Sequence, residues 1–353
     1  MTQMFPSRPA DSLEFREVLY TKAEGIARVT INRPDRYNAY STPCLEELAT
    51  ALRDAAFDDA VGVIVLTGAG DKAFCTGGDV KEYAASYTRR PRDYWKYMGL
   101  FRTYIEAILN SGKPTIARIN GMAVGGGNES NLACDLAVMA EHAHLMQVGS
   151  SVGSVACGGA TQWLPITAGD RRAREILMLN EPVPARQALE WGLVNRVVAS
   201  VKKNGVFVEG ASPAEVKKAE KRQEGYEIDL SRLDAEVDAL ARKLLEKFPE
   251  CARYTKQQIN FWKELSWHQT IGHARDWLAI HYASFEPLEG MSAFVEKRKA
   301  DYVGLRRRAA AGEEVEFMWG AYAAECQACG AKALPSRFTH CGACGKPLAR
   351  SQR

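Results

Sequence analysis

Two short apolar segments, each followed directly by a glycine-rich turn, constrain the fold of this 353-residue chain more than any other feature. The first is VGVIVLT at 61–67, which leads to FCTGGD at 74–79. The second covers residues 114–119 and leads to NGMAVGGGNE at 120–129. Glycine lets a backbone approach a ligand closely, and a helix that begins at such a turn presents free N–H groups. Two such turns can aim two backbone amides at one oxygen atom, which is the geometry of an oxyanion hole.

Ordinary strand-to-helix turns explain either loop equally well when it is taken alone. Neither loop contains the Gly-Lys-Ser/Thr sequence of a P-loop, and neither fits the glycine fingerprint of a dinucleotide-binding site. The sequence therefore indicates two loops that shape a site, without the common nucleotide-binding motifs.

The segments around these loops predict an α/β protein. Residues 26–32 and 135–140 have the β-branched and apolar character of further strands. Between the first two strands, Thr42 and Pro43 suit the start of a helix, with Thr42 as the capping residue. One face of that helix carries Leu45, Leu48 and Leu52. Apolar strands that alternate with helices favour parallel pairing.

The character of the chain changes after Val198. Residues 202–226 are rich in lysine and glutamate and have no apolar period, which predicts a solvated insertion. Helical spacing then returns at Leu233, Val237, Leu240, Leu244 and Phe248, and an aromatic-rich helical region follows as far as Arg308. We therefore expect a core at 1–200, a polar insertion at 201–228, a helical region at 229–315 and a small tail at 316–353.

Charge and hydropathy exclude several classes of protein. Lys and Arg number 46 against 43 Asp and Glu, a net charge of +3, which argues against a dedicated nucleic-acid binder. No apolar run has the length of a membrane span, and residues 1–14 lack the apolar core of a signal peptide. Five of the nine cysteines are scattered, as is usual in a reducing compartment. We expect a cytoplasmic protein.

The other four cysteines form two Cys-x-x-Cys pairs near the C-terminus, Cys326 with Cys329 and Cys341 with Cys344, each followed by glycine. This spacing predicts a structural Zn²⁺ ion in a small zinc ribbon, because four thiolates around zinc can fold a segment too short for its own core. An iron site and disulfides are the alternatives, and His340 is expected to be a bystander. The basic residues after Glu325 suit an RNA contact, although a solvated zinc knuckle is favoured over it.

In order and spacing, the chain resembles the crotonase (enoyl-CoA hydratase/isomerase) superfamily over about residues 14–305. The matching segments are INRPDRYNAY at 31–40, GDKAFCTGGDVKEY at 70–83, KPTIARINGMAVGGGNESNLACDLAV at 113–138, GGATQWLP at 158–165, ARQALEWGLVNRVV at 185–198 and EGMSAFVEKRK at 289–299. The resemblance implies a spiral of ββα turns, with a C-terminal helical region that assembles homotrimers, often paired into hexamers. It also implies an acyl-CoA substrate whose thioester oxygen is held by two backbone amides.

Carried over by position, the resemblance implies that Thr76 and Gly126 supply the oxyanion amides and that Glu129 is the catalytic glutamate. The positions implied for substrate and coenzyme A binding are Arg36, Tyr37, Gly77, Gly78, Asp79, Tyr83, Gly125, Phe294 and Lys297. A compact cation such as Lys297 is also a natural phosphate contact. Two structural alternatives stay open: Glu129 as a first-turn glutamate favoured by the helix dipole, and Lys297 as a solvated surface residue.

One position departs from the family pattern. Simple hydratases of this superfamily use a second glutamate about twenty residues after the first, and here that position is Gly149. Glycine cannot orient or deprotonate water, so a two-acid hydration scheme is in doubt. Glu129 would then act alone or with a hydroxyl group, for which Tyr83, Ser150 and Ser151 are the candidates.

A subgroup of the superfamily resembles this chain more closely: the ring-opening hydrolases of 6-oxocyclohex-1-ene-1-carbonyl-CoA. The similarity lies in KEY at 81–83, RPRDYWKYMGLF at 90–101, the insertion near 200–228 and SRLDAEVDALARKLLEKFP at 231–249. It implies water addition to a cyclic oxo-enoyl-CoA and hydrolytic cleavage of the ring at its ketone. A hydratase or isomerase of another enoyl-CoA, and a noncatalytic scaffold that binds a partner through its zinc ribbon, are the alternative functions.

Overall fold

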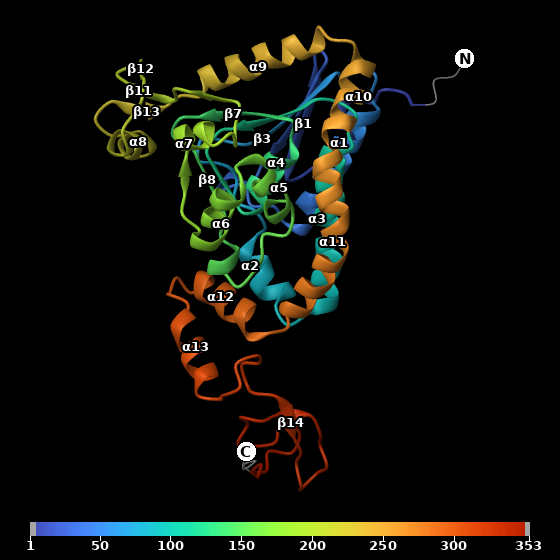
Figure 1. Cartoon of the computed structure of the whole chain (residues 1–353), viewed down its shortest axis with the longest axis vertical. Coiled ribbons are helices and arrows are strands. Elements are labelled where there is room, and N and C mark those ends of the chain that lie inside the picture. Colours follow the sequence, from blue (N-terminus) through green and yellow to red (C-terminus); the bar gives the residue numbers. More distant parts are fainter. Residues whose placement is uncertain (1–4, 350–353) are drawn as a thin grey trace. The chain divides into compact units, whose positions relative to one another are not determined.

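The computed structural model describes residues 5–349, which form two compact units (Figure 1). The first, here called the sheet unit, contains the residues up to Asp79, Lys96–Ser150 and Val155–Arg275. The second, here called the C-terminal unit, contains Val80–Trp95, Ser151–Ser154 and the chain from Asp276 onwards. Both glycine-rich turns therefore lie in the sheet unit.

A six-stranded sheet forms the centre of the sheet unit. The strands follow the order β1 (Val18–Ala23), β2 (Ile26–Ile31), β3 (Val63–Gly68), β5 (Thr115–Ile119), β7 (Leu136–Ala140) and β10 (Arg196–Val198). β1 pairs with β2 in antiparallel fashion, and every later pair is parallel. Every residue of β3 and β5 is buried, as expected for parallel strands covered on both faces. The predicted strands and their parallel pairing are confirmed.

A second, four-stranded sheet runs alongside the first. Its order is β4 (Ala73–Cys75), β6 (Met122–Val124), β8 (His144–Met146) and β9 (Val183–Pro184). Each of the first three follows directly on a strand of the main sheet, so that β3 leads to β4, β5 to β6 and β7 to β8. Helices α3 (Pro91–Leu109), α4 (Gly126–Ala133) and α5 (Ala160–Thr167) follow these pairs in turn. This repetition is the ββα spiral that the resemblance to the crotonase superfamily implied.

Helix α1 (Thr42–Phe57) carries its leucines on the buried face as predicted, but the predicted cap is wrong by one residue. The side chain of Ser41, not that of Thr42, accepts a hydrogen bond from the backbone N–H of Cys44. Thr42 already belongs to the first helical turn, whereas Ser41 keeps the extended backbone that capping requires.

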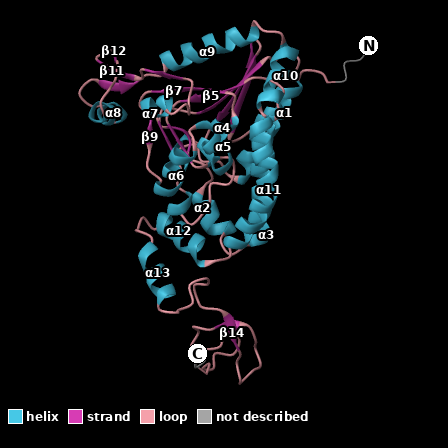
Figure 2. Ribbon diagram, in the orientation of Figure 1, coloured by secondary structure: helices cyan, strands magenta, loops and turns pink. Residues whose placement is uncertain are grey.

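Helix α9 (Ser231–Leu245) packs on β3, β5, β7 and β10 of the main sheet (Figure 2). It buries Leu233, Val237 and Leu240 as predicted. An ion pair of 2.7 Å also joins Asp234 of α9 to Arg118 of β5. Phe248 was expected on the same face, but its side chain is 80% exposed, because the helix ends at Leu245 and Phe248 caps the next helix, α10 (Pro249–Ile259).

The predicted insertion is a folded module and not simply a solvated excursion. Strands β11 (Val201–Lys203), β12 (Val206–Val208) and β13 (Tyr226–Ile228) form an antiparallel sheet beside helix α8 (Pro213–Glu220). Val201, Ala219 and Tyr226 form its small buried cluster. Its few apolar residues follow the two-residue period of very short strands, which a search for helical spacing misses. The domain boundaries at 200 and 228 stay a prediction.

Short helices complete the sheet unit: η1 (Ala10–Leu13), η2 (Pro34–Arg36), α6 (Asp170–Leu179) and α7 (Ala185–Glu190). Helix α11 (Phe261–His281) and the 3₁₀ turn η4 (Gly149–Ser151), like α3, have residues in both units. None of the helices formed by residues 5–349 has the length and apolar run that a membrane crossing needs.

The C-terminal unit contains the short elements α2 (Val80–Glu82) and η3 (Tyr83–Tyr87), the helices α12 (Phe285–Val295) and α13 (Tyr302–Ala310), and the strands β14 (Tyr322–Ala324) and β15 (Leu334–Pro335). Tyr94 and Tyr282 stack with their ring centroids 3.5 Å apart. Tyr83 meets both rings edge-on at about 6 Å. These tyrosines give the unit an aromatic core.

Candidate active site

The two glycine-rich turns meet inside the sheet unit. Gly77 has a φ of +83°, and a Cβ atom built on it would lie 2.9 Å from the backbone nitrogen of Gly126 and 3.2 Å from the carbonyl oxygen of Val124. Real Cβ atoms essentially never come within 3.0 Å of another heavy atom. Only glycine therefore allows the first turn to approach the second this closely, and the two turns lie against each other.

The segment before α1 supports the first turn. The backbone N–H of Tyr40 donates to the carbonyl oxygen of Gly77 at 2.9 Å, and the N–H of Asp79 donates back to the carbonyl oxygen of Tyr40 at 3.0 Å. The hydroxyl of Thr76 donates to the carbonyl oxygen of Tyr37 at 3.2 Å. These bonds hold Thr76 and its amide in a defined position.

The second turn begins helix α4. The N–H of Gly125 donates to the carbonyl oxygen of Met146 at 3.0 Å, and Gly126 is the first helical residue. The first N–H groups of a helix have no partner within it. Among residues 5–349, no acceptor takes the N–H of Gly126 or of Thr76. Both predicted oxyanion amides are therefore available as donors.

Glu129 lies one turn into α4, buried at 6% exposure. Its Oε1 accepts a hydrogen bond of 3.3 Å from the backbone N–H of Ala160, at the start of α5. Burial raises the pKa of the Glu129 carboxyl to about 7, although the N–H groups of Ala160 and Gly158 favour the ionised form. A carboxyl group with a pKa near neutral pH can both accept and return a proton.

Gly158 shows how closely this carboxylate is enclosed. A Cβ at Gly158 would lie 2.8 Å from Oε2 of Glu129 and 2.1 Å from the ring of Phe101. The glutamate is therefore packed between the start of α5 and an aromatic ring of α3. Desolvation of this kind is what raises the pKa of a carboxyl group.

The position of the family's second glutamate is Gly149, which has no side chain. Gly149 opens the 3₁₀ turn η4, and the hydroxyl of the next residue, Ser150, donates to Oδ1 of Asn180 at 2.7 Å. Ser150 is thus engaged with the end of α6, and its assistance to Glu129 stays a prediction. The other two hydroxyl candidates, Ser151 and Tyr83, belong to the C-terminal unit.

The remaining predicted binding residues fall into two groups. Near the first turn, Tyr37 is half exposed, Arg36 is exposed beside Asp35, and a carboxylate oxygen of Asp79 lies 3.2 Å from the guanidinium of Arg33. In the C-terminal unit are Tyr83 in η3, Phe294 on α12 and Lys297 just after it; Lys297 has a φ of +56° and donates its N–H to the carbonyl oxygen of Phe294.

Tyr40, which ends the segment INRPDRYNAY, is a site residue that the sequence pattern does not reveal. Its side chain is 2% exposed, and its hydroxyl oxygen lies 1.6 Å from the point where a Cβ of Gly126 would be. Its ring packs against Phe101 and Tyr104 of α3, with centroids 5.7 and 6.3 Å away. An aromatic residue directly before the helix cap Ser41 was the available signal.

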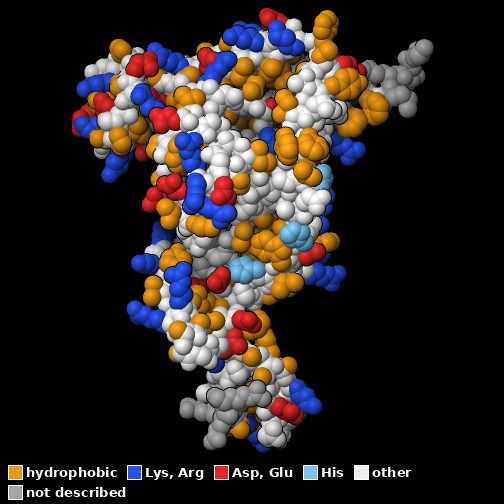
Figure 3. Space-filling model, viewed as in Figure 1, with side chains coloured by type: hydrophobic (Ala, Val, Ile, Leu, Met, Phe, Trp, Pro, Cys, Tyr) orange, Lys and Arg blue, Asp and Glu red, His pale blue; other side chains and the backbone are white. Residues whose placement is uncertain are grey.

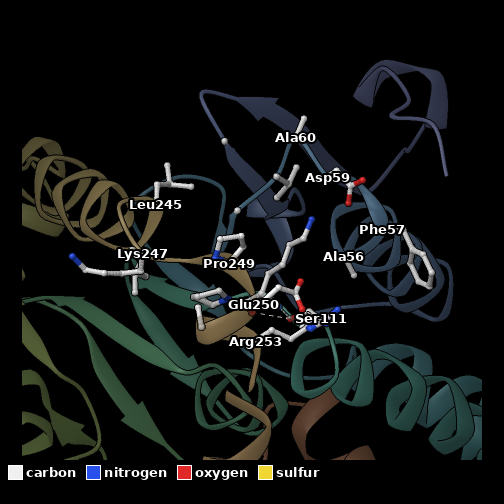
Figure 4. A pocket seen from close by; sticks show the side chains of 18 of the residues that line it. Ala56, Phe57, Asp59, Ala60, Ser111, Leu245, Lys247, Pro249, Glu250 and Arg253 are labelled. Carbon is white, nitrogen blue, oxygen red and sulfur yellow. Dashed lines mark hydrogen bonds and ion pairs between the residues drawn. The ribbon is translucent and has the colours of Figure 1, made fainter. Parts of the chain in front are cut away.

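A cavity of about 810 Å³ lies at the amino ends of strands of the main sheet, opposite the ends that lead to the glycine-rich turns (Figure 4). Its walls include Gly25, Gly62 and Pro114, which precede strands β2, β3 and β5, together with Leu245 and Arg253. The glycine-rich turns instead come after β3 and β5. Ligands of parallel α/β sheets bind at the carboxyl ends of the strands, so this cavity is separate from the candidate active site.

The four C-terminal cysteines come together as the spacing predicted. Their sulfur atoms all lie within 4.8 Å of one another, and the Cys326–Cys344 and Cys329–Cys341 sulfur pairs are 3.7 Å apart. Sulfur ligands at 2.3 Å around a tetrahedral Zn²⁺ would be about 3.8 Å apart, so the four residues fit this ion. Among the described residues, His340 is not part of the cluster.

Comparison with known proteins agrees with this geometry. Residues 21–211 match the model of the family described as Enoyl-CoA hydratase/isomerase. A 6-oxocyclohex-1-ene-1-carbonyl-CoA hydrolase of Geobacter metallireducens is 37% identical over 82% of this chain and 83% of its own length. The hydrolase of the same name from Thauera aromatica is 34% identical over 89% and 85%. Among solved structures, an enoyl-CoA hydratase of Mycobacterium avium subsp. paratuberculosis K-10 matches with a TM-score of 0.66 and 25% identity, covering 82% of this chain and 99% of its own.

Proposed function

Because the chain belongs to the enoyl-CoA hydratase/isomerase family, we propose that it is a hydrolase that opens the ring of a cyclic oxo-enoyl-CoA thioester of the 6-oxocyclohex-1-ene-1-carbonyl-CoA type. The two hydrolases that are 37% and 34% identical carry the name of that substrate. The observation that carries the chemistry is the close approach of Gly77 to Gly126, one helical turn from the buried Glu129.

The first step is the addition of water to the C=C bond conjugated with the thioester. Oxygen bonds to the β-carbon, and the electron pair of the double bond moves onto the thioester oxygen as an enolate. The amides of Thr76 and Gly126 stabilise that charge, at about 3 kcal/mol for a good donor. Protonation of the α-carbon completes the hydration.

The second step cleaves the ring. A second water attacks the ring ketone, and the C–C bond between this carbon and the thioester α-carbon breaks. The former ketone becomes a carboxylic acid, while the electron pair of the broken bond forms a second thioester enolate, which is then protonated at the α-carbon. One pair of preorganised amides therefore serves both steps, and the product is a linear hydroxy-dicarboxylic acid with one end still bound to coenzyme A.

Glu129 is the general acid and base in this proposal. As a carboxylate it takes a proton from water, and as a carboxylic acid it returns that proton to the α-carbon. A pKa of about 7 suits both tasks, because each form is well populated near neutral pH. The single carboxyl group is consistent with Gly149 at the position of the second glutamate.

We assign the substrate contacts by position in the family pattern. Gly77, Gly78 and Gly125 shape the thioester site, and Asp79 and Tyr83 are further substrate-binding positions. Arg36, Tyr37, Phe294 and Lys297 bind the coenzyme A part, in which the phosphates suit the two cations.

Mass spectrometry of the product tests the function. Incubation of the purified protein with 6-oxocyclohex-1-ene-1-carbonyl-CoA should give a thioester heavier by two waters. A gain of one water would identify a hydratase instead, and an unchanged mass with a moved double bond an isomerase. No turnover of this or of linear enoyl-CoAs would favour the noncatalytic scaffold.

The four-cysteine cluster is proposed to hold a structural Zn²⁺ ion. The sulfur spacing fits the tetrahedral ion, and the backbone N–H of Ala343 donates to the sulfur of Cys341 at 3.4 Å, an outer contact typical of metal-bound thiolates. The ion would supply folding energy to the ribbon and take no part in the chemistry.

A homotrimer or hexamer is the proposed assembly. Large apolar side chains are exposed along α10 and the first turns of α11, where Figure 3 shows hydrophobic groups on the surface: Tyr254, Ile259, Phe261, Trp262 and Leu265. Exposed apolar patches of this kind mark contact surfaces between proteins. We also propose a cytoplasmic location, which the free thiols of the nine cysteines support.

A further inference from the structure

We propose that Tyr40 is a positioning residue that sets the spacing between the turn of Thr76 and the turn of Gly126. The inference rests on the proposed function, because the spacing matters only if the two amides hold one oxygen. It concerns a residue to which neither the family pattern used above nor the names of the relatives assign a role.

The main chain of Tyr40 is bonded to the first turn. Its N–H donates to the carbonyl oxygen of Gly77 at 2.9 Å, and its carbonyl oxygen accepts from the N–H of Asp79 at 3.0 Å. These two bonds flank Gly78, which pairs with Tyr40 in a parallel β-bridge. The backbone of Tyr40 therefore moves with the first turn.

The side chain of Tyr40 reaches the second turn. Its hydroxyl oxygen lies 1.6 Å, and its Cζ 2.8 Å, from the point that a Cβ of Gly126 would occupy. The phenol end is thus seated against the Cα of Gly126, in the place of a missing side chain. One residue spans both amide-bearing turns through a rigid ring.

The ring itself is held from the other side. Phe101 and Tyr104 of α3 pack against it, and the hydroxyl of Tyr104 donates to the hydroxyl of Ser130 at 3.0 Å. The hydroxyl of Ser130 in turn donates to the carbonyl oxygen of Gly126 at 2.8 Å. The same aromatic cluster therefore fixes both the ring of Tyr40 and the first turn of α4.

This arrangement makes the separation of the turns depend on the length of one side chain. Oxyanion donors act only when they lie close to the position that the developing charge will occupy. A small change in their separation lowers the rate of the chemical step, while the binding of the distant coenzyme A part is unaffected. Tyr40 should therefore affect kcat and leave KM nearly unchanged.

A double-mutant cycle between residues 40 and 126 tests the proposal. Tyr40→Leu shortens the side chain that separates the two turns, and Gly126→Ala adds the methyl group that the phenol excludes. Tyr20→Phe is the control, because it removes a tyrosine hydroxyl of β1 that donates to Asp54 of α1, away from both turns. We expect kcat to fall about 100-fold for Tyr40→Leu and about tenfold for Tyr40→Phe, with KM within about twofold, as for misplaced catalytic donors. Tyr20→Phe should leave both constants unchanged.

The coupling between the two sites is the decisive measurement. Gly126→Ala should reduce kcat at least about tenfold more in the wild-type background than in the Tyr40→Leu background, because the smaller leucine makes room for the methyl group. The thermal unfolding temperature should show the same non-additivity without reference to activity. Additive effects in both measurements, or an unchanged kcat in Tyr40→Leu, would overturn the inference.

The two proposals fail in different ways. If the wild-type protein turns over no enoyl-CoA, the proposed function fails and the inference that rests on it falls with it. If the wild type is active and the variants at Tyr40 behave like Tyr20→Phe, only the inference is wrong.

Discussion

The backbone N–H of Ala160 donates a hydrogen bond of 3.3 Å to Oε1 of Glu129, at the point where α5 begins. This bond stabilises the carboxylate, whereas burial of the side chain stabilises the neutral acid. Burial has the larger effect, so the pKa of Glu129 rises from 4.5 to about 7. The two opposing influences leave the carboxyl group able to work in both protonation states.

The activity should follow the ionisation of Glu129. As the base that activates water, Glu129 must be deprotonated in the free enzyme, so kcat/KM should fall about tenfold for each pH unit below about 7 and level off above it. Initial rates between pH 5 and pH 9 (about two units either side of the pKa) measure this profile. If kcat/KM instead began to fall only below about pH 4.5, the ordinary pKa of glutamate, the role of the buried carboxyl would be contradicted.

Replacing Glu129 with glutamine should lower activity and change how stability depends on pH. We expect a loss of about 10²- to 10⁴-fold in kcat, since the acid/base group is gone. The folded pKa is raised, so the native state keeps its proton between about pH 4.5 and pH 7 while the unfolded chain loses it. Wild-type stability should therefore fall as the pH rises through that window, by on the order of 3 kcal/mol, and Glu129→Gln should lack this loss.

Urea unfolding at pH 5 and pH 8 (about the two ends of the window) compares the two proteins. The exposed Glu181 provides the matched variant, because Glu181→Gln should leave both the activity and the pH dependence as in the wild type. Near wild-type turnover by a folded Glu129→Gln protein would refute the catalytic assignment.

Gly77→Ala should damage the site beyond its effect on the backbone. Gly77 and Gly70 both have φ near +80°, so an alanine at either position pays about 1 kcal/mol or more in strain. A Cβ at Gly77 would press on the nitrogen of Gly126, whereas one at Gly70 meets nothing within 4 Å. We expect Gly77→Ala to lose at least about 30-fold in kcat and Gly70→Ala to keep wild-type kcat. Gly77→Ala should also unfold at the lower temperature of the two, because its Cβ must displace the backbone of Gly126. Equal activities would show that the approach of the turns is not needed.

Zinc removal should unfold the ribbon and spare the rest of the chain. Cys326, Cys341 and Leu348 are the buried cluster of this segment, too few residues for a stable core without metal. Chelation, or Cys329→Ser, should release the ion and make residues 326–348 sensitive to protease, while turnover persists. Cys251→Ser, at an exposed cysteine outside the cluster, should retain one zinc per chain. Metal analysis that finds no zinc in the purified protein would remove the assignment.

Lys297→Gln should weaken coenzyme A binding without slowing the chemistry. A lysine that contacts a phosphate contributes a charge-assisted hydrogen bond, so its loss should raise KM about three- to tenfold and leave kcat unchanged. Lys299→Gln removes a neighbouring exposed charge and is the matched control. Equal KM values for the two variants would mean that Lys297 is a solvated surface residue.

Patterns local to the chain predicted much of what is found. The apolar runs of β3 and β5, the leucine face of α1 and the paired cysteines each depend on residues close in sequence, where periodicity and ligand spacing are direct physical requirements. Three details did not follow from such patterns. Ser41 caps α1 because of the backbone conformation before it, Phe248 lies beyond the end of α9, and the insertion folds on very short strands.

The amino-acid order alone was enough to identify two glycine-rich turns, one glutamate in the first turn of a helix and a four-thiol cluster, since each is written within a few residues of chain. Folding in three dimensions was needed to bring Gly77 against Gly126, to seat the phenol of Tyr40 against Gly126 and to raise the pKa of Glu129. These properties depend on which residues far apart in the chain come into contact and exclude water from one another. No pattern within a few residues of sequence encodes such contacts.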